Sequence, residues 1–75
     1  MTDKNKKLAK AINKFRSKIM RITKRKGRTE SVGEDEMRTI DDTFPVYDSG
    51  LSYDERLERI QLIDGFHDWC YSLIA

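Results

Sequence analysis

A long stretch without helix breakers sets the first limit on how this chain can fold, because neither glycine nor proline occurs from Lys4 to Lys26. Within that stretch, apolar residues recur at spacings of four, three, four and three: Leu8, Ile12, Phe15, Ile19 and Ile22. These spacings follow the period of an α-helix and place the five side chains on one face. Thr2 or Asp3 can cap the start of this helix, and Gly27 can end it. The pattern predicts a helix over residues 4–26.

A second helical pattern covers the last third of the sequence. Ser52 and Glu55 have the spacing of a capping box, and Asp54 adds another acid at the positive end of a helix. One broad face then collects Tyr53, Leu57, Ile60, Ile63, Phe66, Cys70 and Leu73, with Leu62, Trp69 and Ile74 beside it. We predict a helix over residues 53–74 whose apolar face is wider than a single partner helix would cover.

The segment between these helices, residues 27–51, is an acidic connector that holds three of the four glycines and the only proline. A structureless connection of roughly 20 residues is uncommon inside a domain. Ser31 and Glu34 again have capping-box spacing, and Met37 and Ile40 fall on one face, so a short helix over about residues 34–41 is predicted. Residues 44–47 should be extended, because Pro45 disfavours helix at the residue before it.

These elements predict an all-α fold with one small helical domain over residues 1–75. We expect a helix-loop-helix, with residues 4–26 antiparallel to residues 53–74 and a connector that has room for the short middle helix. Cys70 is the only cysteine, which excludes an internal disulfide and fits a reducing compartment. No apolar run approaches the roughly 20 residues needed to span a bilayer. The sequence therefore predicts a cytoplasmic protein without membrane association.

The charge of the chain is divided between its two ends. Residues 1–28 contain twelve bases and one acid, a net charge of +11, whereas residues 29–75 contain three bases and twelve acids, a net charge of −9. Such an asymmetry indicates either binding to a polyanion or packing of one half against the other.

The density of bases along the first helix favours nucleic-acid binding, single- or double-stranded, through contacts to phosphates. The predicted binding residues are Lys7, Lys10, Lys14, Arg16, Lys18, Arg21, Lys24, Arg25, Lys26 and Arg28. Base recognition needs amides or arginines directed into a groove, or exposed aromatic rings. The basic half offers only Asn5, Asn13 and Phe15 for this, so we expect contacts to the backbone.

Three other interpretations stay open at this stage. The acidic half can neutralise the basic helix within the chain. A basic amphipathic helix is also typical of membrane surfaces and calmodulin targets, although residues 53–74 offer it a matching apolar face. Finally, Phe66, Trp69 and Leu73 can form a protein interface, either for an adaptor or inhibitor or for a homodimer that completes a four-helix arrangement.

Catalytic and metal chemistry are not expected. His67 and Cys70 are three residues apart, with Asp64 and Asp68 nearby, but nucleophilic catalysis also needs an orienting group, an anion site and a water-excluding cleft. A metal at Asp64, His67 and Cys70 would need ligands from elsewhere. We predict a protein that is not an enzyme and has no cofactor or metal.

Two basic segments, Lys14-Phe15-Arg16-Ser17-Lys18 and Lys24-Arg25-Lys26-Gly27-Arg28, lie in a helix-loop-helix of this length. In length and order of elements, the whole chain resembles the small helical proteins of T4-like bacteriophages that are associated with the UvsW recombination helicase. This resemblance implies an accessory role in phage DNA replication, recombination or repair, beside a helicase or another DNA-processing protein. It implies no ATPase site, since the chain has no Gly-rich phosphate-binding loop followed by Lys and Ser/Thr.

Overall fold

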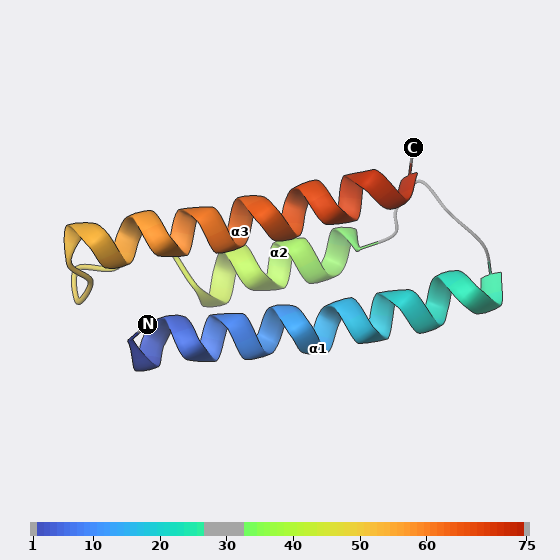
Figure 1. Ribbon diagram of the computed structural model, residues 1–75, viewed down its shortest axis with the longest axis horizontal. Helices are drawn as coiled ribbons and strands as arrows, with labels where there is room; N and C mark the ends of the chain where they lie inside the picture. The colour runs from blue at the N-terminus through green and yellow to red at the C-terminus, as the bar shows by residue number, and fades with distance from the viewer. Residues whose placement is uncertain (1, 27–32, 75) are drawn as a thin grey trace.

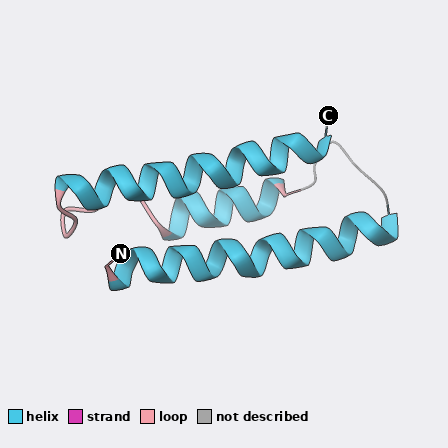
Figure 2. Ribbon diagram, viewed as in Figure 1, coloured by secondary structure: helices cyan, strands magenta, loops and turns pink. Residues whose placement is uncertain are grey.

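The structure, a computed structural model, describes residues 2–26 and 33–74, apart from the side chains of Arg25, Lys26 and Ile74. The described residues form three α-helices: α1 (Asp3–Lys26), α2 (Glu34–Thr43) and α3 (Tyr53–Ile74) (Figure 1, Figure 2). The all-α class is thus confirmed, and the two long helices have nearly the predicted bounds. The segment predicted as a connector over residues 27–51 contains a ten-residue helix, so the fold is a three-helix bundle rather than a hairpin.

The two long helices run parallel to each other, which contradicts the predicted antiparallel pairing. Asn5 near the start of α1 contacts Glu55 and Glu58 near the start of α3, and Arg16 lies over Trp69 further along. Figure 1 shows α2 running in the opposite direction between the two ends of the bundle. Because α2 carries the chain back along the bundle, the direction reverses twice, and α3 points the same way as α1.

The core lies where the three helices meet. Its buried residues are Leu8, Ile12 and Ile19 of α1, Met37 and Ile40 of α2, and Ile63, Phe66 and Cys70 of α3. The predicted apolar faces were too long. Ile22 of α1 is 38% exposed, and Tyr53 and Leu57 of α3 are 73% and 42% exposed, so both apolar faces extend beyond the core.

The middle helix begins at a glycine. Gly33 is the N-cap of α2, has φ 79°, and makes no side-chain cap hydrogen bond. A Cβ atom at this position would lie 2.8 Å from the Cys70 sulfur, so the close approach of α2 to α3 requires glycine. The predicted cap at Ser31 lies outside the described residues. The predicted helix over residues 34–41 is confirmed, and it extends two residues further, to Thr43.

Asp48 holds the turn between α2 and α3 in place. Phe44 has φ −124° and ψ 70°, which is neither helical nor extended, and Val46 and Tyr47 form a turn, so the predicted extended segment over residues 44–47 is not found. Asp48 accepts a hydrogen bond of 2.8 Å from the Gly50 backbone N–H, which lowers the pKa of this carboxyl together with Lys4 of α1, 3.4 Å away. The turn is thereby joined to the first turn of α1.

Side-chain caps start both long helices as the sequence predicts. Thr2 accepts a hydrogen bond from the Asn5 N–H at 3.4 Å, and Ser52 accepts one from the Glu55 N–H at 3.3 Å. None of the described helices is long and apolar enough to cross a membrane.

Candidate nucleic-acid interface

Each of the three helices carries a net charge, and the sign differs between α1 and the other two. At neutral pH α1 carries eleven bases and one acid, a net charge of +10. The other two helices are acidic: α2 has five acids and one base, and α3 has five acids and two bases. The polarity found along the sequence is therefore a polarity between one long helix and the two helices packed against it.

The side of α1 away from the core carries a line of exposed cations, Lys7, Lys10, Lys14, Arg21 and Lys24, which we name the basic stripe. Their spacings repeat the helical period, and so these residues share the face opposite Leu8, Ile12 and Ile19. At 1.5 Å per residue the stripe extends for about 25 Å. It runs along the 40 Å long axis of the bundle.

Two further predicted binding residues of α1 lie off the basic stripe and contact neighbouring helices. The Arg16 guanidinium is half-buried and lies 5.2 Å from the centre of the Trp69 ring. Lys18 forms an ion pair of 3.4 Å with Glu36 of α2. The side chains of Arg25 and Lys26, and all of Arg28, lie outside the described part of the chain. The structure therefore brings five of the ten predicted residues together on one exposed face.

Close ion pairs with acidic residues neutralise few of the α1 bases in the described part of the chain. In the described part of the chain, α1 makes ion pairs through Lys4 with Asp48 and through Lys18 with Glu36. None of the five stripe residues has a carboxylate oxygen within 4.0 Å there. Screening at physiological salt limits exposed charges to a range of about 8 Å, so acids on the far sides of α2 and α3 cancel little of the stripe's field.

The aromatic residues predicted for a protein interface belong mainly to the core. Phe66 is completely buried, which excludes it as an exposed anchor. It stacks on Trp69 with ring centres 6.3 Å apart, and the half-buried Leu73 packs against the same cluster. A homodimer was one open alternative, because two helices alone would leave this face uncovered; in the structure Met37 and Ile40 of α2 pack in the same core cluster as Phe66.

A buried polar clamp joins α1 to α3, and the sequence interpretation missed it. Asn5 is completely buried; its Oδ1 accepts a hydrogen bond of 3.1 Å from Arg59 Nε, and its Nδ2 donates to Glu58 Oε1 at 2.8 Å. Arg59 also donates to the Pro45 carbonyl at 2.9 Å. Asn5 cannot read bases. Its position three residues before Leu8, on the apolar face, was the available signal.

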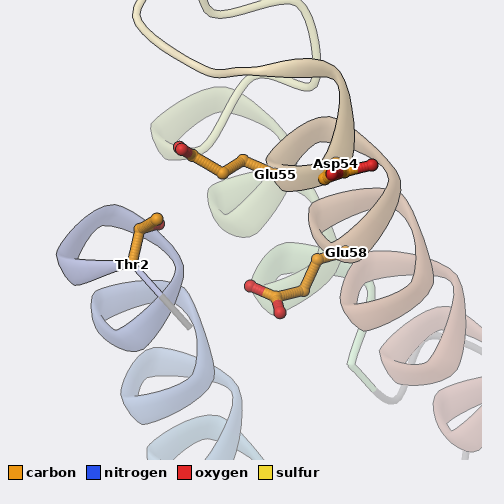
Figure 3. A pocket seen from close by; sticks show the side chains of 4 residues that line it. All are labelled: Thr2, Asp54, Glu55 and Glu58. Atoms are coloured by element: carbon orange, nitrogen blue, oxygen red, sulfur yellow. The ribbon is translucent and has the colours of Figure 1, made fainter.

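An acidic hollow of about 270 Å³ lies where the first turns of α1 and α3 meet, lined by Thr2, Asp54, Glu55 and Glu58. Figure 3 shows Glu55 and Glu58 extending toward α1 and Asp54 pointing away. The parallel arrangement explains these acids, because it brings the positive ends of two helix dipoles together. This corner of the molecule is stabilised by negative charge and would repel a phosphate backbone.

The residues considered for catalysis or metal binding have separate surroundings. His67 lies 3.1 Å from Asp41 of α2, whereas Cys70 is completely buried. Burial, together with the nearby Glu36, raises the pKa of the Cys70 thiol to about 11, so the nucleophilic thiolate is disfavoured. Within residues 2–26 and 33–74, no group of three or more His, Cys, Asp or Glu side chains could hold a metal ion.

Comparison of the chain with protein family models, with curated proteins and with solved structures finds no match.

Proposed function

We propose that this protein binds nucleic acid, without catalysing a reaction, through the basic stripe on α1. The observation that carries the proposal is the line of five exposed cations, about 25 Å long, on a helix with a net charge of +10. Lysine and arginine placed in this way neutralise successive phosphates and release their counterions, which gives affinity with little dependence on sequence.

The acidic helices α2 and α3 restrict where on the molecule a polyanion can bind. A polyanion that approaches the molecule is attracted by α1 and repelled by α2 and α3, which are both negatively charged. Such a field favours one orientation of the bound strand, parallel to the helix axis. The protein would then cover a short length of nucleic acid and present its acidic side outward.

The wider setting is also part of the proposal. We propose that the protein works in the cytoplasm of a bacterial host, beside a helicase or another DNA-processing protein. The single cysteine supports a reducing compartment. The phage setting and the neighbouring helicase are supported by the resemblance in length and order of elements.

The position of the charge, and not its total, is the quantity to test. Lys10→Gln with Lys14→Gln removes two stripe cations, whereas Lys4→Gln with Arg38→Gln removes two cations elsewhere and gives the same net charge. In fluorescence anisotropy with labelled single-stranded DNA, the first pair should make the slope of log K against log salt shallower by about 1.4, which is about 0.7 for each lost phosphate contact. The second pair should leave the slope nearly unchanged. Equal effects of the two pairs would reject the stripe as the binding surface.

A further inference from the structure

A groove of about 190 Å³ lies between α1 and α3, next to the basic stripe. The two long helices lie side by side along the bundle (Figure 1), and the groove is lined by residues of these two helices. Its volume is below the roughly 300–1,000 Å³ typical of pockets that enclose whole small-molecule ligands. A hollow of this size suits one flat group of a larger ligand.

Small residues keep the groove open. Ala9 of α1 and Gly65 of α3 both line it, and a Cβ atom built at Gly65 would have no heavy atom of another part of the molecule within 4 Å. Ile12 and Leu62 provide apolar surface in the same groove. A glycine in the middle of a helix costs about 1 kcal/mol relative to alanine, and no close helix contact requires one here. The open space beside Gly65 is therefore available to a ligand.

The groove also carries hydrogen-bonding groups from both helices. Asn13 and Gln61 are exposed side-chain amides, each with a donor and an acceptor side by side. Arg16 also lines the groove, and its buried Nε has no hydrogen-bond partner within the described residues. Paired donors and acceptors of this kind match the edges of nucleobases.

The charges on the two sides of the groove differ in sign. On α1, Asn13 is next to Lys14 and three residues from Lys10, both in the basic stripe. On α3, the exposed Asp64 and Asp68 follow Gln61 at successive spacings of three and four residues, so they lie on the same face of the helix. A phosphate backbone is thus held on the α1 side and repelled from the α3 side, so the base attached to it points from α1 across the groove.

We infer that this groove receives an unpaired base of a single-stranded nucleic acid whose phosphates lie on the basic stripe. The inference rests on the proposed function and narrows its ligand from any polyanion to a single strand. Bases in a duplex are paired and stacked, so they cannot enter a groove on the protein without being flipped out. Insertion of a base into the groove contributes binding free energy in addition to that of the phosphate contacts.

The test compares two labelled single strands of equal length, one with all its bases and one made of abasic nucleotides, which have the same phosphates. Wild-type protein should bind the intact strand at least fivefold more tightly than the abasic strand, the lower end of what one stacked base contributes (roughly 5-fold to 150-fold). Gly65→Leu fills the groove without changing any charge. This variant should bind the two strands equally, at the affinity that the wild type has for the abasic strand.

Gly65→Ala is the matched control, because it adds only a methyl group and removes the same helix-interior glycine. It should keep most of the preference for the intact strand. Equal binding of both strands by the wild type, or an undiminished preference in Gly65→Leu, would overturn the inference while leaving the basic stripe in place. If neither strand binds, the proposed function itself is rejected.

Discussion

At the scale of single residues, the contact that best explains the parallel pairing of α1 and α3 is the clamp between Asn5 and Arg59. Both side chains are buried, and the asparagine uses its acceptor for Arg59 and its donors for α3. A buried guanidinium is stable only when its N–H groups have acceptors. The clamp therefore favours the one register in which the first turn of α1 meets the second turn of α3.

Asn5→Ala should destabilise the protein by about 2–3 kcal/mol, because it leaves Arg59 Nε buried without an acceptor. Urea unfolding followed by far-UV circular dichroism measures this change. Asn13→Ala, on the exposed side of the same helix, is the control and should change the free energy of unfolding by no more than about 0.5 kcal/mol. Similar losses in the two variants would show that the clamp does not determine the pairing.

Cys70 makes stability depend on pH in the alkaline range. Its thiol has a pKa of about 11 in the folded protein against an ordinary value of 9.0, mainly because of burial. The stabilisation is complete below pH 9.0 and is lost as the pH rises toward about 11, since the unfolded chain forms the thiolate first. Wild type should lose more unfolding free energy between those two pH values than Cys70→Ala. Parallel losses would mean that the thiol ionises equally easily in the folded state.

At the scale of elements, α2 determines the architecture, and its packing depends on Gly33. Gly33→Ala should destabilise the fold by about 1–3 kcal/mol, because a left-handed backbone is strained for alanine and the new methyl group meets Cys70. Gly65→Ala should instead stabilise it by about 0.5–1 kcal/mol, as the helix interior there is open. Thermal unfolding of the two variants compares them directly. Two shifts of the same sign would contradict the close approach of α2 to α3.

The sequence predicts the elements better than their directions. The periodic stretches locate α1 and α3 to within about one residue, since caps and apolar spacing act locally. The direction of α3 depends on whether the connector reverses the chain once or twice, and only the packing of Met37 and Ile40 against both long helices decides that. Arg16 was predicted as fully exposed for the same reason, because its partner Trp69 is far away in the sequence. Lys18 is exposed as predicted, but the sequence did not indicate its ion pair with the distant Glu36.

At the scale of the whole molecule, the inward and outward faces of the three helices have different roles. The inward faces build a small core around Phe66, while the outward face of α1 keeps its cations free of close carboxylates in the described part of the chain. The acids of α2 and α3 bring the net charge down to +2 without covering that face. The net charge of the chain is thus small although positive and negative charges lie on different sides of the molecule.

The claim that the basic stripe binds a phosphate backbone is tested most directly by the affinity of the wild-type protein for single-stranded DNA over a salt series from about 50 to 200 mM. If the five stripe cations each contact one phosphate, log K should fall linearly with log salt at a slope of about −3.5. A slope near zero, or the absence of binding at the lowest salt, would show that the stripe does not bind a phosphate backbone.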